Sequence, residues 1–386
     1  MKPVNVLYLI RTWAFGGSHT IILLLLKHLP KDRFNITVIP YETPSGTDRQ
    51  FIDAARKEGH FIPDDRIPWD GRMDWFAARR KIGELIEKYK VDLIHAHDTN
   101  SIVLVGVRRK RWPCACVASP YGWWETWYRF RARANHWVER NLALPNFDRV
   151  ITVSNDMKTK ILRGRTKEDK IRVIHTGLDL TRFDSGGSRP EVRRKLGIPD
   201  EAIVAGTVSR LFPEKGHRYL LDAVKILANE IPTLRLLIVG TGDLMRPLEN
   251  YASELGLRSR VTFTGFYDDL PGALRGMDIF VQPSVQEEGF PTAILEAQLA
   301  KRPVIASDIG GARETFDAGN AGLLVPPKNV NALADALRAL AKDPERCVRM
   351  GERGRAFVEQ RFTLSAMTAK VTETYIEALD EYNRRQ

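Results

Sequence analysis

The sequence predicts an α/β protein built from two doubly wound domains, because one rhythm of elements occurs twice along the chain. In each half, short apolar runs alternate with glycine-containing turns and with segments of helical periodicity. Fully apolar short strands separated by helices indicate parallel sheets that are covered on both faces. A turn-rich stretch at residues 184–190 separates the two halves and is the best candidate for a linker.

In the first half, the apolar runs predict strands at residues 4–10, 34–40, 91–96, 117–119 and 149–153. The periodic segments between them predict helices at residues 20–29, 47–58 and 73–89. Ser18 is expected to cap the first of these helices.

In the second half, strands are predicted at residues 203–208, 234–239, 261–264, 279–282 and 303–307. Helices are predicted at residues 217–230, 244–255, 270–275, 292–300 and 365–381. The expected domains are therefore residues 1–184 and 185–363, with a helical segment at 364–386. Ligands of such sheets lie at the carboxyl ends of the strands, so we expect a cleft between two facing domains and the chemistry in the loops.

Composition excludes several classes of protein. The chain has 386 residues, of which 43% are hydrophobic, so it can bury a full core. Its longest aliphatic run, Ile21–Leu26, is much shorter than the roughly 20 residues of a membrane-spanning helix. The first ten residues read as a strand and not as a signal peptide, which predicts a cytoplasmic protein. Three cysteines without metal-site spacing indicate reduced thiols.

The net charge of +11 lies entirely in the first half. Residues 1–184 hold 32 Lys and Arg against 21 Asp and Glu, whereas residues 185–386 hold 27 of each kind. Residues 108–140 combine eight bases and two acids with five of the eight tryptophans. This pattern fits an anionic partner such as a membrane surface, a nucleic acid or a phosphorylated substrate, and it equally fits a solvated basic face over packed Trp side chains.

Two loops could bind phosphate. Gly16-Gly17-Ser18 follows the first strand and opens a helix, where backbone N–H groups can meet a phosphate oxygen, although a tight turn is the alternative. Arg210 and Lys215 flank a proline-containing loop after the first strand of the second half. Two cations at a strand end suit a diphosphate, and the alternative is a pair of solvated bases.

The motif Glu287-Glu288-Gly289-Phe290-Pro291-Thr292-Ala293-Ile294-Leu295-Glu296-Ala297 is the sharpest signal. Pro291 fits the first position of a helix, so Glu288 lies in the preceding loop and Glu296 lies within the helix. A carboxylate can accept hydrogen bonds from two neighbouring hydroxyls, as a ribose or a hexose presents them. Glu296 stands among apolar residues, and a buried acid needs a partner.

The ordered set of motifs resembles the retaining glycosyltransferases of family 4, which have the GT-B fold of two Rossmann-like domains. The second half carries the resemblance through SRLFPEKG, IVGTGDL, FTGF, VQPS, EEGFPTAILEA, VIASDIGGARE and GLLVPP. The first half adds the GG loop, VDLIHAHD, VITVSNDM and VIHTGLDLTRF. The resemblance implies a nucleotide-sugar donor on the second domain, an acceptor on the first domain, and a final helix that crosses back onto the first domain.

The resemblance also implies roles for individual residues. Arg210 and Lys215 would hold the donor diphosphate, Glu288 the sugar hydroxyls and Glu296 the ribose hydroxyls. The remaining donor contacts would come from Gly17, Phe266, Gly289, Phe290 and Pro291. The acceptor hydroxyl would attack from the face that the nucleoside diphosphate leaves, and the two cations would stabilise the charge that develops on the leaving group. No Asp-x-Asp motif occurs, so no metal and no resident cofactor are expected.

The acceptor side departs from the family pattern at one position. Many members carry a His after the strand that corresponds to residues 117–119, where this sequence has Tyr121. A phenol could still donate to a sugar hydroxyl. His97 and Asp98 end the VDLIHAHD motif and are candidates for the acceptor side, although a His at a strand end is often structural.

The expected function is transfer of a hexose from a UDP or GDP sugar to a glycan or lipid-linked acceptor in the synthesis of cell-surface polysaccharide or glycolipid. The basic, Trp-rich residues 108–140 would suit the inner face of an anionic plasma membrane. One alternative is a nucleotide-sugar epimerase on the same fold. The second alternative is a protein of another class that binds nucleic acid through its basic aromatic face, although no nucleic-acid-binding motif occurs.

Overall fold

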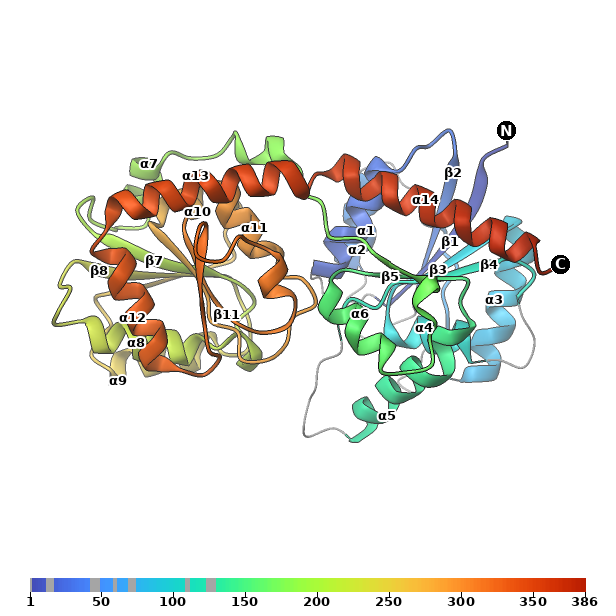
Figure 1. The fold of residues 1–386 in the computed structure, drawn as a ribbon, viewed down its shortest axis with the longest axis horizontal. Coiled ribbons are helices and arrows are strands. Elements are labelled where there is room, and N and C mark those ends of the chain that lie inside the picture. Colours follow the sequence, from blue (N-terminus) through green and yellow to red (C-terminus); the bar gives the residue numbers. More distant parts are fainter. Residues whose placement is uncertain are drawn as a thin grey trace. The chain divides into compact units, whose positions relative to one another are not determined.

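The computed structural model describes residues 2–11, 17–41, 49–57, 61–68, 74–107, 112–122 and 130–386. They form two compact units, and each is an α/β unit as expected (Figure 1). The first unit comprises residues 1–177 and 364–386, and the second comprises residues 178–363. The division falls after Gly177, ahead of the turn-rich stretch at 184–190, because residues 178–183 pack in the core of the second unit and helix α7 begins at Arg189.

The first unit has a parallel sheet with the strand order β2-β1-β3-β4-β5-β6 among its described residues. The strands are β1 (Val4–Ile10), β2 (Phe34–Pro40), β3 (Leu93–Ala96), β4 (Ala115–Ala118), β5 (Arg149–Thr152) and β6 (Ile171–Val173). The helices are α1 (Gly17–His28), α2 (Arg49–Lys57), α3 (Trp75–Tyr89), α4 (Thr99–Gly106), α5 (Phe130–Val138), α6 (Asn155–Leu162) and α14 (Leu364–Asn383).

The second unit repeats the plan with the strand order β12-β11-β10-β7-β8-β9. Its strands are β7 (Ile203–Val208), β8 (Leu234–Val239), β9 (Val261–Gly265), β10 (Ile279–Gln282), β11 (Val304–Ser307) and β12 (Gly322–Val325). Its helices are α7 (Arg189–Lys195), α8 (His217–Leu227), α9 (Met245–Glu254), α10 (Leu270–Gly276), α11 (Thr292–Leu299), α12 (Val330–Ala341) and α13 (Pro344–Arg361).

Three local predictions need correction. Helix α1 begins at Gly17, so Ser18 lies inside the first turn and does not precede the helix as its cap. Pro291 has extended backbone angles and stands just before α11, which begins at Thr292. Strand β4 ends at Ala118, and the expected strand residue Ser119 follows it. Each error is a shift at an element's end, where periodicity carries little information.

Both sheets show a reversal of strand order that predicts where ligands bind. In the first unit the chain moves outward from β1 to β2 and then in the other direction from β3, so the reversal lies between β1 and β3. In the second unit it lies between β7 and β10. Ligands of open α/β sheets bind outside the carboxyl ends of the strands at this point.

Helix α14 follows the second unit in the chain but packs in the first unit, as expected (Figure 1). It lies against β4, β5 and α1. Met367, Val371, Tyr375 and Ala378 are buried in the same core as Tyr8 of β1. The end of the chain therefore completes the core of the first unit.

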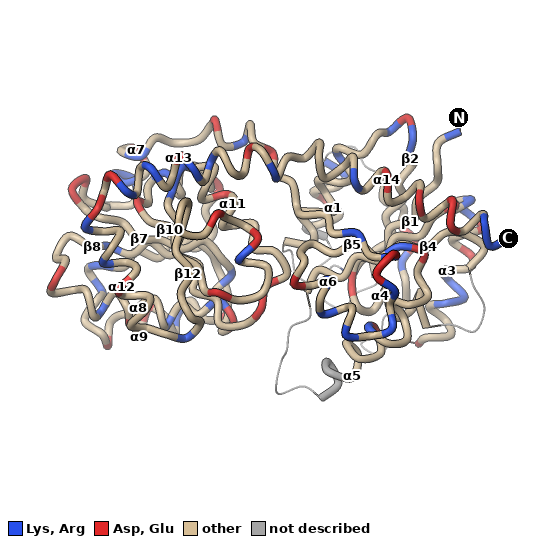
Figure 2. The backbone as a smooth tube through the Cα atoms, in the orientation of Figure 1, with Lys and Arg blue, Asp and Glu red and all other residues tan. Residues whose placement is uncertain are grey.

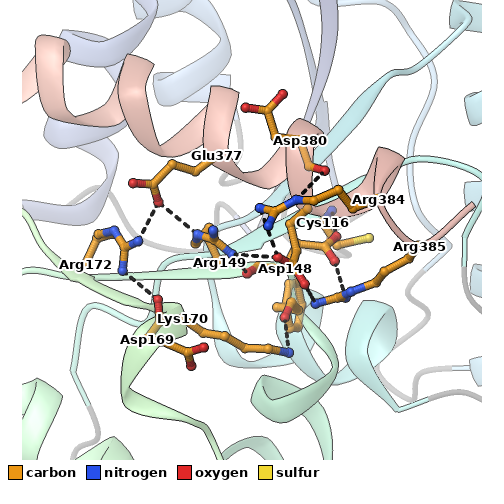
Figure 3. Close-up of polar contacts among 12 residues, drawn as sticks. Cys116, Asp148, Arg149, Asp169, Lys170, Arg172, Glu377, Asp380, Arg384 and Arg385 are labelled. Atoms are coloured by element: carbon orange, nitrogen blue, oxygen red, sulfur yellow. Dashed lines mark hydrogen bonds and ion pairs between the residues drawn. The ribbon is translucent and has the colours of Figure 1, made fainter.

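Ion pairs tie α14 to the strands beneath it (Figure 3). Glu377 accepts hydrogen bonds from Arg149 at 2.8 Å and lies 2.7 Å from Arg172. Arg385 donates to Asp148 at 2.8 Å, and the other carboxylate oxygen of Asp148 accepts from the backbone N–H of Cys116 at 2.8 Å. Because Arg149 and Asp148 are buried, these charges need their partners, and the partners fix the position of α14.

Residues of both charge signs are spread over each unit (Figure 2). Much of the predicted basic segment, residues 108–111 and 123–129, lies outside the described residues. Within the described parts of the chain, no helix is both long enough and apolar enough to cross a membrane.

Candidate active site

The second unit brings Lys215 and Glu288 together at its reversal of strand order. Lys215 lies in the loop after β7, and Glu288 lies in the loop after β10, the neighbouring strand. Lys215 Nζ donates a hydrogen bond to Glu288 Oε2 at 2.7 Å. Their side chains are only 14% and 17% exposed. The two loops that carried the strongest sequence signals thus meet at the point where the topology predicts a ligand.

Two glycines let these loops approach each other. Gly216 has φ 71°, and a Cβ there would stand 2.0 Å from the carbonyl oxygen of Pro283. Gly310 has φ 56°, and a Cβ there would stand 2.4 Å from the carbonyl oxygen of Glu288. The carbonyl of Glu288 also accepts a hydrogen bond from Gly311 N–H at 2.9 Å. Only glycine fits at both positions, so the backbone around Glu288 is fixed from two sides.

Polar side chains hold the carboxylate of Glu288 in its ionised form. Its Oε1 accepts a hydrogen bond from Gln282 Nε2 at 2.8 Å and another from the Ser284 hydroxyl. Burial by itself would raise the pKa of Glu288, but Lys215 and these hydrogen bonds hold that pKa below its ordinary value. Sequence reasoning did not assign roles to Gln282 and Ser284, although both belong to the VQPS motif that it singled out.

Arg210 and Glu296 have other neighbours in this unit. The guanidinium of Arg210 lies over the ring of Phe212 at 4.8 Å and 3.9 Å from the carboxylate of Glu214. Glu296 is half-buried on α11, and the positive charge of Arg182 acts on it. Burial raises the pKa of Glu296 to about 7, and the attraction of Arg182 only partly opposes that rise.

The other donor candidates line the same loops or the end of β9. Gly289, Phe290 and Pro291 lead from Glu288 into α11. The ring of Phe290 packs 5.6 Å from that of Phe362, centroid to centroid. Phe266 follows β9 and is 75% exposed, which leaves its ring available to a flat ligand.

The first unit brings the three acceptor candidates to its own reversal of strand order. His97 and Asp98 follow β3, and Tyr121 follows β4. The Tyr121 hydroxyl and His97 Nδ1 share a hydrogen bond of 2.8 Å. Gly17 begins α1, and no atom of the described residues, apart from its chain neighbours and its own helix backbone, lies within 4 Å of the place where its Cβ would be.

Asp98 has a structural task at this edge. It caps α4 by accepting hydrogen bonds from the backbone N–H groups of Asn100 and Ser101 at 2.9 and 3.1 Å. It also accepts one from Arg11 N–H at 3.0 Å, which ties the end of β1 to the start of α4. Both carboxylate oxygens are therefore engaged within the unit.

The pKa of Glu296 makes the stability of the second unit depend on pH. A carboxyl group whose pKa rises from 4.5 to about 7 on folding binds more protons in the folded chain between these values, so stability falls as the pH rises through that range. Glu296→Gln should remove this loss of stability at higher pH. We expect the variant to unfold at a higher temperature than the wild type at pH 8, with little difference at pH 4.5.

Thermal unfolding from pH 4.5 to 8 measures this effect. Glu254→Gln, at an exposed position of α9, is the matched control and should follow the wild type throughout. Parallel pH curves for the Glu296→Gln variant and the wild type would contradict the raised pKa.

Among the described residues, no group of three or more His, Cys, Asp or Glu side chains is arranged to hold a metal ion. The cations of the candidate site are side chains, Lys215 and Arg210. Cationic side chains of this kind can stabilise a diphosphate electrostatically.

Comparison with known proteins agrees with the motifs in both halves. Residues 15–182 match the family model described as Glycosyltransferase Family 4, and residues 188–357 match the one described as Glycosyl transferases group 1. A GDP-mannose-dependent alpha-(1-6)-phosphatidylinositol monomannoside mannosyltransferase of Mycobacterium tuberculosis is 31% identical over 333 residues, which cover 84% of this chain and 85% of that protein.

Two further relatives extend the likeness over almost the whole chain. The UDP-Gal:alpha-D-GlcNAc-diphosphoundecaprenol alpha-1,3-galactosyltransferase of Escherichia coli is 28% identical over 377 residues, 94% of each protein. The crystal structure of Anabaena HepE with UDP-glucose superposes with a TM-score of 0.83 at 23% identity, over 96% of this chain and 98% of that one. The fold is thus GT-B, and the relatives give no support to an epimerase or a nucleic-acid-binding protein. The chain belongs to the glycosyltransferases of family 4.

Proposed function

We propose that this glycosyltransferase moves a hexose from a UDP or GDP sugar to a glycan or lipid-linked acceptor, with retention of configuration and without a metal ion. The observation that carries the proposal is the Lys215–Glu288 pair, which lies at the reversal of strand order with Gln282 and Ser284 behind it. Relatives that use GDP-mannose and UDP-galactose support the class of donor. Their names also support a lipid-linked or glycolipid acceptor in the synthesis of cell-surface glycans.

The roles follow from the chemistry of each side chain. Lys215 and Arg210 would meet the diphosphate, and the Glu288 carboxylate would accept hydrogen bonds from sugar hydroxyls. Glu296 would do the same for the ribose. Phe266 would lie against the base, and backbone groups of residues 289–291 and Gly17 would line the sugar and the phosphate.

The proposed step conserves atoms and charge. The acceptor oxygen forms a bond to the anomeric carbon on the face from which the nucleoside diphosphate leaves, while the bond from that carbon to the phosphate oxygen breaks. The acceptor's proton passes to the departing phosphate oxygen. Lys215 and Arg210 would stabilise the negative charge that grows on that oxygen, as cationic side chains in an active site can do.

A donor screen tests the proposal. The full chain is heated with UDP and GDP sugars in turn, and the true donor should raise the unfolding temperature by mass action, by about 2.7 kcal/mol at a concentration 100 times its Kd. Incubation with that donor and lipid-linked sugars should give a product whose anomeric configuration, read by NMR, equals that of the donor. EDTA should not slow the reaction. An inverted product or a loss of rate in EDTA would overturn the corresponding part of the proposal.

We further propose that residues 108–140 bring the protein to an anionic membrane surface. Among the described side chains of this segment, Trp137 on α5 is 51% exposed, and Trp side chains favour the interface of a bilayer. Flotation with vesicles of phosphatidylglycerol and of phosphatidylcholine tests the idea. Binding to the anionic vesicles only is expected, and equal recovery with both would contradict it.

A further inference from the structure

A chain of buried polar side chains runs through the core of the first unit and begins on β1. The hydroxyl oxygens of Tyr8 and Tyr375 share a hydrogen bond of 2.7 Å. The Tyr375 hydroxyl also lies 2.7 Å from His95 Nδ1, and His95 Nε2 lies 2.7 Å from the Ser119 hydroxyl. Helix α14, which carries Tyr375, thus supplies the link between two strands of the sheet.

The chain continues to the acceptor side. Beside this chain, the Tyr121 hydroxyl lies 2.8 Å from His97 Nδ1. The rings of His95 and His97 also contact each other directly, with centroids 3.8 Å apart. A continuous path therefore joins Tyr375 in the core to His97 at the carboxyl end of β3.

The path ends at an atom that lacks a partner. His97 Nε2 is buried and has no hydrogen-bond partner among the described residues. Leaving a buried polar atom unpaired is costly, and such atoms often mark a place where a ligand completes the set. His97 lies at the reversal between β1 and β3, where this fold binds its ligand.

A count of protons indicates what kind of ligand this is. Tyr121 and His97 each carry one proton that can be donated when the histidine is neutral, but a single hydrogen bond joins them. Burial lowers the pKa of both histidines, which keeps them neutral. One of the two protons is therefore left over, either on the Tyr121 hydroxyl or on His97 Nε2.

The direction of the hydrogen bond between Tyr121 and His97 decides which group keeps the spare proton. If the Tyr121 hydroxyl donates to His97 Nδ1, the spare proton is on His97 Nε2, the buried atom that lacks a partner, and an oxygen that reaches this atom can accept it.

We propose that His97 donates a hydrogen bond from Nε2 to an oxygen of the sugar acceptor, and that Tyr375 of α14 is a positioning residue for it. The proposal rests on the proposed function, because it takes the carboxyl edge of the first sheet to be the acceptor side. In this arrangement His97 is a neutral donor and does not act as a general base. The acceptor's proton still passes to the leaving phosphate.

The position of the proton can be measured without any substrate. Nitrogen-15 NMR of the full chain, labelled at histidine, separates the two neutral tautomers by the shifts of Nδ1 and Nε2. A His97→Gln sample assigns the signals by difference. We expect both His95 and His97 to carry the proton on Nε2. A proton on Nδ1 of His97, or a charged ring at pH 7, would overturn the proposal whatever the enzyme's substrate is.

Activity measurements distinguish a hydrogen-bond donor at His97 from a general base. His97→Gln keeps an N–H group near the place of Nε2, whereas His97→Phe keeps only the ring shape. With the donor and acceptor found in the screen above, the Phe variant should lose about tenfold more kcat/KM than the Gln variant. Equal losses of kcat/KM in the two variants would show that proton abstraction or the shape of the ring determines the rate. That result would contradict the proposal. Absence of any transfer by the wild type would instead refute the proposed function and leave the NMR result standing.

Tyr8, a hydrogen-bond partner of Tyr375, provides a matched control for the Tyr375 variant. Tyr375→Phe and Tyr8→Phe each remove one buried phenolic oxygen, but only the first breaks the link to His95. We expect Tyr375→Phe to raise the KM for the acceptor about five- to tenfold and to leave donor binding unchanged, while Tyr8→Phe changes neither. Equal effects of the two variants on the acceptor KM, at similar unfolding temperatures, would refute the positioning role.

Discussion

Lys215→Ala is expected to lower kcat/KM for sugar transfer by about two to three orders of magnitude. Removing one preorganised donor from developing negative charge costs about 3–4 kcal/mol in other enzymes, and Lys215 carries a full charge in a site that is largely closed to water. Because the charge develops on the leaving group, the loss should fall mainly on kcat. Steady-state kinetics with the donor found by thermal screening measures it.

The loss is separable from a folding defect. Without Lys215, Glu288 still accepts hydrogen bonds from Gln282 and Ser284, so its carboxylate keeps two of its three side-chain partners. Lys225→Ala removes a lysine from an exposed position of α8 in the same unit and should keep full activity. A Lys215→Ala enzyme that folds and retains a third or more of the wild-type rate would refute the role of this lysine on the leaving group.

The periodic elements of both sheets could be predicted from the sequence, because buried parallel strands are apolar throughout and are flanked by glycine turns. Strand β1 and strands β7, β8 and β10 have the bounds that their apolar runs predict. The ends of the helices and strands were harder to predict. The helix that follows the first glycine loop takes Gly17 and Ser18 into its first turn, and nothing in the local pattern distinguishes that from a cap at Ser18.

The site could be predicted in part. The spacing of the motifs identified Lys215 and Glu288, but their ion pair depends on loops that are far apart in sequence and that two glycines allow to meet. Asp98 stays a prediction for the acceptor side, and its oxygens also cap α4 and bind Arg11 N–H. A carboxylate just before a helix is a capping signal, so that task was visible in the sequence.

Tyr375 illustrates what sequence reasoning could not reach. Its position in a helical pattern marks it as one more apolar contact, and nothing near it in the chain indicates a polar partner. Its partners, Tyr8 and His95, lie on two strands at the other end of the chain and meet it only because α14 returns to the first unit. Long-range polar contacts of this kind follow from topology, and no local pattern encodes them.

The return of α14 leads to the second large prediction, that Val371→Asp will unfold the first unit. Val371 is 2% exposed and belongs to the core that α14 shares with β1 and α1. An aspartate there would bury a carboxyl group without a partner and remove apolar contacts, at a cost of about 4 kcal/mol or more. That is a large part of the stability of an ordinary domain, about 5–15 kcal/mol.

The neighbouring position supplies the control for this prediction. Lys370 precedes Val371 in α14 and is exposed, so Lys370→Asp introduces the same side chain into the same helix and should change stability by no more than about 0.5 kcal/mol. Urea unfolding followed by hydrogen exchange should show early loss of protection in β1, β3 and β4 of the Val371→Asp variant, while β7, β8 and β10 of the second unit keep theirs. Because α14 follows the second unit in the chain, its loss would leave that unit whole and deprive the first of Tyr375 as well as its apolar cover. Equal stability of the two variants would mean that α14 only rests on a core that is complete without it, and the positioning of His95 by Tyr375 would lose its structural basis.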